Sequence, residues 1–300
     1  MRLVLLGVRG STPAPGARFV RYGGHTSCVA VLAAGEDVPS LVLDAGTGLR
    51  ELPGLMGGRP FRGTLVLTHL HWDHVQGLPF CPSVDHPDAV VEAYVPGDWS
   101  AAAGDRAARR LLARAMSPPH FPIGPDGLLG SWRFRPARPG ALGTGAADPR
   151  LTVAEVAHKG GTTLGIRVEM DGASVACLPD HVPGDRAADA LVRGADVLLH
   201  DGQFLDREHD RARDYGHATI GAALDLADRC EVGRLVLTHH APARTDDELD
   251  ALAAALPSTP RGRPVSFARQ GDVLTVTSSP RDPLPGTTER RQSRTGPRSR

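Results

Sequence analysis

Three histidines and an aspartate lie within the six residues 69–74 (HLHWDH), directly after a short segment rich in Leu and Val. In an extended chain alternate side chains share a face, so His69 and His71 can point at one ion. If a helix begins near Asp73, then Asp73 and His74 project from its first turn toward a neighbouring position. The positive end of the helix dipole also favours a carboxylate there. Imidazole and carboxylate ligands without thiolate suit zinc, manganese or iron, and of these we favour zinc.

The elements that must position this cluster are short apolar runs bounded by turn residues, which predict β-strands. The runs are Arg2–Leu6, Ser27–Ala33, Ser40–Leu43, Thr64–Thr68, Val90–Val95, Leu151–Val156, Leu164–Glu169, Ser174–Leu178, Asp196–His200 and Arg234–Thr238. Apolar residues at helical spacing predict helices over Ala101–Met116, Thr219–Arg229 and Asp246–Leu256. We interpret this as an α/β (α+β) protein with two sheets packed on each other and flanked by helices, in one domain over residues 1–278.

Two segments lie outside this predicted core. Ser117–Pro149 is rich in Pro and Gly and is predicted to be a long loop, which in a compact domain is usually functional or disordered. Residues 279–300, rich in Arg, Ser and Pro, lack apolar side chains to bury and are predicted to be a disordered tail.

Composition narrows the classes of function. Lys+Arg and Asp+Glu balance at 34 each, so no overall charge recruits nucleic acid or a membrane surface. The four cysteines lie far apart without a CxxC pair, which argues against a zinc knuckle, a redox dithiol or a disulfide framework. No apolar stretch approaches the length of a membrane-spanning helix, and the N-terminal apolar run is too short for a signal peptide. We therefore expect a cytoplasmic protein.

The HxHxDH pattern after a strand resembles the motif of the metallo-β-lactamase fold, a four-layer αββα sandwich with metals at one sheet edge. The resemblance extends over roughly residues 1–277. The segments 7–13 (GVRGSTP) and 22–27 (YGGHTS) are similar to the N-terminal strand-loop-strand of its RNase Z and cyclic-nucleotide phosphodiesterase branch. The segment 41–48 (LVLDAGTG) resembles the family's strand that ends in an Asp, here Asp44, which orients the metal loop.

The same resemblance implies three further metal ligands. His158 sits at a strand end where the family places its next histidine, and Asp180 matches the aspartate that bridges two ions. His181 stays a rival to Asp180, because the preceding Leu-Pro departs from the commoner small-polar sequence. His239 matches the last ligand; its neighbour His240 is disfavoured because the two side chains should point to opposite sides. Trp72 is expected to pack under the metal loop rather than to wall the site.

The resemblance implies two divalent ions. One ion takes His69, His71, His158 and Asp180, and the other takes Asp73, His74, His239 and the shared Asp180. Metals about 3.5–4 Å apart can hold a bridging hydroxide, which would be the nucleophile.

A second motif separates branches within the fold. Residues 215–219 (YGHAT) resemble the His-Ser/Thr-Thr element of RNase Z-like phosphodiesterases, and residues 200–204 (HDGQF) resemble that branch's His-Glu-Ala-Thr-Phe stretch. The implied pair is Asp201 and His217, with the histidine touching a phosphate oxygen or protonating the leaving alkoxide. We therefore expect Asp73, Asp201 and His217 to be catalytic.

The leading functional hypothesis is a metal-dependent phosphodiesterase acting on a nucleotide or another small phosphodiester. The alternatives are a tRNA 3′-processing endoribonuclease, a carboxylic ester or lactone hydrolase, and a non-catalytic metal-binding regulatory domain. The tRNA hypothesis is less favoured because the 117–149 segment carries scattered Arg residues but no dense basic face. No membrane partner is expected, and an oligomer is left open.

Overall fold

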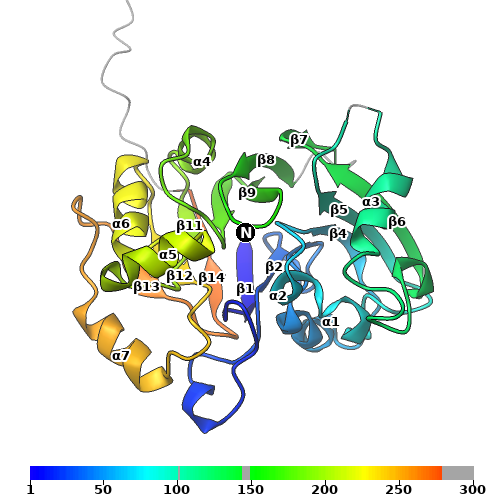
Figure 1. The fold of residues 1–300 in the computed structure, drawn as a ribbon, viewed down its shortest axis with the longest axis horizontal. Helices are drawn as coiled ribbons and strands as arrows, with labels where there is room; N and C mark the ends of the chain where they lie inside the picture. The colour runs from blue at the N-terminus through cyan, green and yellow to red at the C-terminus, as the bar shows by residue number, and fades with distance from the viewer. Residues whose placement is uncertain (101, 144–148, 279–300) are drawn as a thin grey trace, which may run out of the picture.

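The computed structural model describes residues 1–100, 102–143 and 149–278. Its strands form two seven-stranded sheets (Figure 1). The first has the order β14 (Val273–Thr275), β1 (Arg2–Gly7), β2 (Cys28–Leu32), β3 (Leu41–Leu43), β4 (Arg62–Val66), β5 (Val90–Pro96), β6 (Ser131–Ala137). The second has the order β13 (Val265–Phe267), β12 (Leu235–Thr238), β11 (Val197–Asp201), β10 (Ala173–Leu178), β9 (Thr163–Met170), β8 (Arg150–Val156), β7 (Gly140–Leu142).

Helices cover the outer face of each sheet. In Figure 1, α1 (Leu52–Met56), α2 (Trp72–Val75) and α3 (Asp105–Leu112) lie on the side of the first sheet. The helices α4 (Arg186–Val192), α5 (His209–Tyr215), α6 (Ile220–Arg229) and α7 (Asp246–Ala255) lie on the side of the second. The architecture is therefore the predicted sandwich of helices, two sheets and helices.

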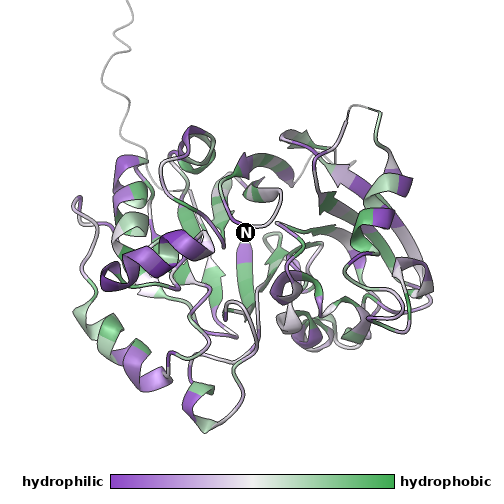
Figure 2. Ribbon diagram, in the orientation of Figure 1, coloured by the Kyte–Doolittle hydropathy of each residue, from purple (hydrophilic) through white to green (hydrophobic). Residues whose placement is uncertain are grey.

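Three apolar layers hold the sandwich together. Strands that are covered on both faces bury nearly all their side chains and so contribute to two of these layers. The layer between the sheets joins residues such as Leu5 and Leu43 to Ile166 and Leu199. The two outer layers pack each sheet against its helices. Figure 2 shows this distribution, with hydrophobic residues along the strands and hydrophilic residues on the outward faces of the helices.

Parallel pairing brings several strand ends to one edge of the sandwich. In the first sheet β3 and β4 run parallel, and in the second β10, β11 and β12 run parallel. The strand β8 has the same direction as β10, because each pairs antiparallel with β9. Side chains that follow the carboxyl ends of these strands must therefore lie near one another.

The structure departs from the sequence-based expectations mainly at the periphery. The segment Ser117–Pro149, predicted to be a long loop, contains the edge strands β6 and β7, although residues 144–148 are outside the described part. The helix predicted over Ala101–Met116 is the shorter α3, and residue 101 is not described. The helix predicted over Thr219–Arg229 is present as α6, with the Thr219 side chain accepting a hydrogen bond from the Ala222 N–H.

Among the described residues, none of the helices has the length and apolar character needed to cross a bilayer. The prediction of a disordered tail over residues 279–300 falls outside the described residues.

Candidate metal centre

The 69–74 segment leaves β4 in an extended conformation and then turns into the short helix α2. His71 is the extended residue that precedes the helix, and Asp73 and His74 lie within α2. The His74 N–H donates to the His71 carbonyl at 3.0 Å, which closes the turn. Because the chain changes from extended to helical at this point, His69 and His71 face one position, and Asp73 and His74 face a neighbouring one. This is the arrangement that the sequence predicted.

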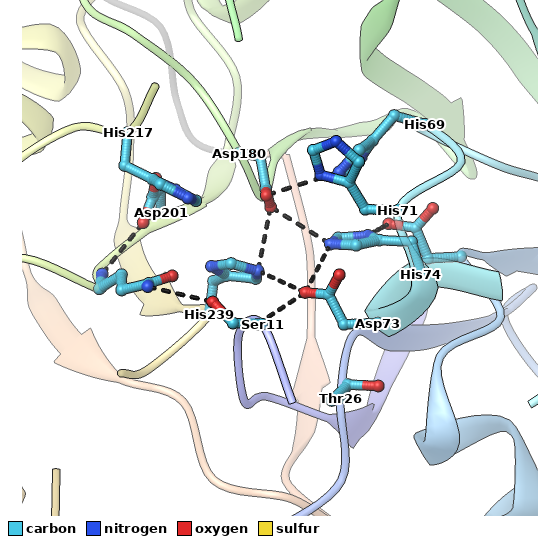
Figure 3. Close-up of polar contacts among 12 residues, drawn as sticks. Ser11, Thr26, His69, His71, Asp73, His74, Asp180, Asp201, His217 and His239 are labelled. Atoms are coloured by element: carbon cyan, nitrogen blue, oxygen red, sulfur yellow. Dashed lines mark hydrogen bonds and ion pairs between the residues drawn. The ribbon is translucent and has the colours of Figure 1, made fainter. Parts of the chain in front are cut away.

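Three side chains from distant parts of the chain, His158, Asp180 and His239, converge on the four candidate ligands of this segment, and Figure 3 shows Asp180 and His239 among them. Together these side chains form one group of His69, His71, His158 and Asp180 and a second group of Asp73, His74 and His239, and within each group the ligand atoms lie within 4.8 Å of one another. The structure thus brings together every residue that the sequence indicated as a metal ligand.

Asp180 lies between the two groups and presents one carboxylate oxygen to each. Its Oδ2 is 3.6 Å from His69 Nε2 and 3.5 Å from His158 Nε2. Its Oδ1 is 3.3 Å from His74 Nε2 and 3.2 Å from His239 Nε2. A carboxylate in this position has the arrangement required of a ligand shared by two ions.

The donor set fits divalent cations. His69 Nε2, His74 Nε2 and Asp180 Oδ1 are buried and lack a hydrogen-bond partner within the described part of the chain. Leaving one such atom unsatisfied costs about 1–3 kcal/mol, so several in one place call for a ligand that satisfies them together. Imidazole nitrogens and carboxylate oxygens at these spacings are consistent with a dinuclear metal site.

Electrostatics favour the ligand forms in the group of His69, His71, His158 and Asp180. Burial lowers the pKa of His71 and His158 and holds that of His69 well below its usual value, so these imidazoles stay neutral with a free lone pair. Burial alone would raise the pKa of Asp180, but the surrounding histidines outweigh it and hold that carboxyl well below its usual range. Asp180 is therefore ionised.

Asp44, at the end of β3, orients His74. Its Oδ2 accepts a hydrogen bond from His74 Nδ1 at 2.8 Å, and its Oδ1 accepts from the Thr68 N–H at 2.7 Å and from the Thr68 hydroxyl at 2.9 Å. With the Nδ1 proton directed at Asp44, the Nε2 lone pair of His74 faces the centre. The Nδ1 of His158 is held in the same way by the Gly216 carbonyl at 2.5 Å.

The two rival histidines point elsewhere. His181 Nδ1 lies 3.2 Å from His200 Nε2 in a buried pair away from the two ligand groups. His240 Nε2 donates to the Ala268 carbonyl at 2.8 Å. His239 instead takes a left-handed backbone conformation (φ 55°), and its ring stacks on those of His74 and His217. The two side chains therefore point to different sides, as expected, but through the left-handed conformation of His239 rather than through the alternation of an extended strand.

Asp201 and His217 form a buried pair beside the second ligand group. His217 Nδ1 donates to Asp201 Oδ2 at 2.7 Å, and Asp201 Oδ1 accepts from the Gln203 N–H at 3.0 Å. Burial would lower the pKa of His217, but the Asp201 carboxylate outweighs it and raises that pKa to about 9. His217 also lies within 4.8 Å of ligand atoms of Asp180 and His239, so its ring reaches the centre.

Sequence reasoning missed the part played by Ser11. The Ser11 N–H donates to Asp73 Oδ2 at 2.7 Å, and the Ser11 Oγ accepts from Gln203 Nε2 at 3.2 Å. Gly10 makes this approach feasible, since a Cβ there would lie 2.4 Å from the His239 ring. Residues 10–12 (GST) belong to a segment that resembles the RNase Z and cyclic-nucleotide phosphodiesterase branch, and this was the available signal. Nothing in the spacing of the sequence indicated that these residues contact the 69–74 segment.

Two cavities flank the centre. One of about 460 Å³ is lined by His69 and His71 together with Trp72. The other, of about 360 Å³, is lined by Ser11 and His217. A substrate whose reacting atom sits at the centre therefore has room for one substituent on each side.

Comparison with known proteins places the site in a family context. The family model described as "Beta-lactamase superfamily domain" matches residues 41–240. A ribonuclease Z of Mycolicibacterium gilvum is 29% identical over 291 residues, which cover 85% of this chain and 90% of that enzyme. A ribonuclease Z of an Exiguobacterium species is 44% identical, but over only 68 residues, 23% of this chain and 22% of that enzyme.

Solved structures share the fold. The short form of human tRNase Z aligns with a TM-score of 0.62 and 21% identity, covering 92% of this chain and 100% of that one. A diphosphatase of the PhnP family aligns with a TM-score of 0.66 and 19% identity, covering 91% of this chain and 97% of that one.

Proposed function

This chain belongs to the metallo-β-lactamase superfamily, and from that premise we propose that it is a metal-dependent phosphodiesterase acting on a nucleotide or other small phosphodiester. The observation that carries the phosphodiester assignment is the buried Asp201–His217 pair at 2.7 Å, beside an intact His/Asp metal-binding motif. The relatives named ribonuclease Z and the PhnP-family diphosphatase support a phosphorus-centred reaction rather than attack on a carbonyl.

The metal ligands follow from the two groups of side chains. In this proposal one ion is held by His69, His71, His158 and Asp180, and the other by Asp73, His74, His239 and the shared Asp180. Two divalent cations, with zinc favoured, would supply Lewis-acid activation of water and neutralise negative charge on the phosphoryl group.

The residues around the centre orient and protonate. Asp44 keeps the His74 proton on Nδ1, and the Ser11 N–H fixes Asp73 Oδ2. His217 carries its Nδ1 proton toward Asp201, so its other nitrogen is available to the substrate. Because its pKa is raised to about 9, that ring is an imidazolium near pH 7 and can donate to a phosphate oxygen or to the leaving alkoxide. A phosphodiester carries a permanent negative charge that this cation can contact, whereas a neutral carbonyl substrate does not, which disfavours the ester and lactone alternative.

The size of the substrate separates this proposal from its main rival, tRNA 3′-end processing. The ribonuclease Z relative that matches along most of the chain favours that second candidate. Against it, the 117–149 segment, which carries scattered Arg residues but no dense basic face, contributes edge strands β6 and β7 to the two sheets. A tRNA ligand needs many phosphate contacts, whereas a small phosphodiester needs only the centre and its two flanking cavities.

The test combines metal analysis with a substrate panel. We expect purified, zinc-loaded protein to hold two ions per chain and to hydrolyse bis(p-nitrophenyl) phosphate and cyclic or dinucleotide phosphodiesters, with the activity lost to a chelator and restored by metal. Efficient cleavage of pre-tRNA with negligible turnover of small diesters would favour the second candidate. Metal-loaded protein that hydrolyses lactones but no phosphodiester would overturn the proposal.

A further inference from the structure

Trp72 stands exposed beside the candidate metal centre. The sequence led us to expect that it packs under the metal loop, yet the residue is 75% exposed, whereas its neighbours Asp73, His74 and Val75 in α2 are buried. The short helix therefore turns its buried face to the centre and the core and presents the indole outward. An exposed tryptophan offers a large rigid apolar surface with a donor at one end, which is what a ligand-stacking residue provides.

The indole borders a continuous surface that begins at the metal ligands. The cavity of about 460 Å³ is lined by His69, His71 and Trp72 and also by Arg114 and Ala115. A second cavity, of about 380 Å³, shares Trp72, Arg114 and Ala115 with the first. The ring of Trp72 is thus common to both cavities, and a group placed on it would remain in reach of the centre.

The far end of this surface is aromatic. Phe80 is 63% exposed and packs edge-to-face on Phe121 with ring centroids 5.6 Å apart, and both line the second cavity. Exposed large apolar side chains gathered at the mouth of a site mark a binding surface more often than a stability feature. The lining is therefore suited to a flat apolar group rather than to water.

One cation accompanies the aromatic surface. Arg114 is exposed and forms no ion pair with any residue in the ranges 1–100, 102–143 and 149–278. Asp98 is the acidic residue that lines the cavity of about 460 Å³ together with Arg114. A free guanidinium can contact a phosphate or the polar edge of a base, and it adds to stacking on an indole. The combination of indole, guanidinium and metal ligands matches a phosphate ester that carries an aromatic group.

We propose that Trp72 is the stacking platform for the aromatic substituent of the phosphodiester that stays on phosphorus during hydrolysis, a nucleobase or an aryl ring, with Arg114 beside it. This inference rests on the proposed function. His217, the proton donor for the leaving oxygen, lies on the opposite side of Asp180 from His69 and His71 (Figure 3) and lines the other cavity. The departing group therefore belongs on the His217 side and the retained group on the Trp72 side.

The test compares two esters with the same leaving group. Thymidine 5′-(p-nitrophenyl phosphate) and methyl p-nitrophenyl phosphate differ only in the retained substituent. Replacing an aromatic side chain on which a base stacks by alanine typically weakens binding by about tenfold or more. Trp72→Ala should therefore raise KM for the thymidine ester about tenfold and leave kcat/KM for the methyl ester within about twofold. Trp72→Phe should recover most of the difference, and bis(p-nitrophenyl) phosphate tells whether any aryl ring suffices.

Two controls keep the test decisive. Trp132→Ala changes a tryptophan that stacks on Phe134 away from the centre, and it should alter neither ester. Calorimetry with thymidine 5′-monophosphate and with inorganic phosphate measures the preference without turnover, so it still tests the platform if the protein hydrolyses no phosphodiester. Equal loss on both esters in Trp72→Ala, or an unchanged preference for the thymidine ligands, would overturn the inference.

Discussion

Replacing Asp44 with asparagine should weaken one metal ion selectively, because Asp44 fixes the proton of His74. The Asp44 carboxylate is buried and accepts from His74 Nδ1 at 2.8 Å and from the Thr68 N–H at 2.7 Å. Asparagine has the same shape, but when its oxygen accepts the Thr68 N–H its amide NH₂ faces His74. The imidazole must then accept at Nδ1 and carry its proton on Nε2, the atom that faces Asp180 Oδ1 at 3.3 Å.

The size of the effect follows from this change of tautomer. A protonated Nε2 has no lone pair for a cation, so binding requires the contact between His74 and the substituted amide to be broken or reversed. Loss of such an outer partner of a ligating histidine typically lowers metal affinity 10- to 100-fold, or by about 1.4–2.8 kcal/mol. The ion held by His69, His71 and His158 does not use His74 and should keep its affinity apart from the contribution of the shared Asp180.

Zinc titration against a chelator of known affinity measures both ions. We expect wild-type protein to bind two ions per chain and Asp44→Asn to retain one tightly and lose affinity for the other by that factor. Asp126→Asn, on an exposed carboxylate paired with Arg109, is the matched control and should bind like the wild type. Unchanged affinity for both ions in Asp44→Asn would refute the reasoning.

His217→Ala should slow phosphodiester hydrolysis about 100-fold or more but keep both metals, because it removes the proton donor and leaves the metal ligands in place. Elemental analysis measures the metal content, and loss of metal in parallel with activity would contradict this role. Asp201→Asn removes the carboxylate that raises the pKa of His217 to about 9, so activity, which depends on the imidazolium below that pKa, should fall at a lower pH than in the wild type. An alkaline limb that does not move in the pH–rate profile would argue against the pair. Burial lowers the pKa of His240 to about 3, so only the unfolded chain takes up its proton as pH falls below about 6.5. His240→Phe should therefore flatten the loss of melting temperature between about pH 6.5 and pH 4, and an unchanged slope would count against this.

The centre of the fold was accessible from the sequence because buried strands carry a clear signal. The run Leu41–Leu43 and residues 235–237 of β12 are apolar throughout, since layers on both faces cover them. The 69–74 segment was equally clear, because ligating residues crowd behind a buried strand. Only the family resemblance indicated which distant residues join this segment. The strand ends meet because the strands from β8 to β12 lie side by side in one sheet, and no local spacing in the sequence predicts that order.

The edges of the sheets were missed for a physical reason. The strand β6 buries only Phe134 and Ala137, with Arg133 and Arg135 on either side of Phe134, in a stretch rich in Pro and Gly. Such a half-exposed edge strand lacks the apolar continuity that marked the central strands. Trp72 was misplaced because residue type predicts burial, while its position in α2 is fixed by the neighbours that must face the centre.

The most direct test of the account is anomalous diffraction at the zinc edge from crystals of the zinc-loaded protein. We predict two peaks, one beside each oxygen of Asp180, the first among His69, His71 and His158 and the second among Asp73, His74 and His239. A single surface peak, or none within reach of Asp180, would contradict the claim that these side chains hold a pair of cations.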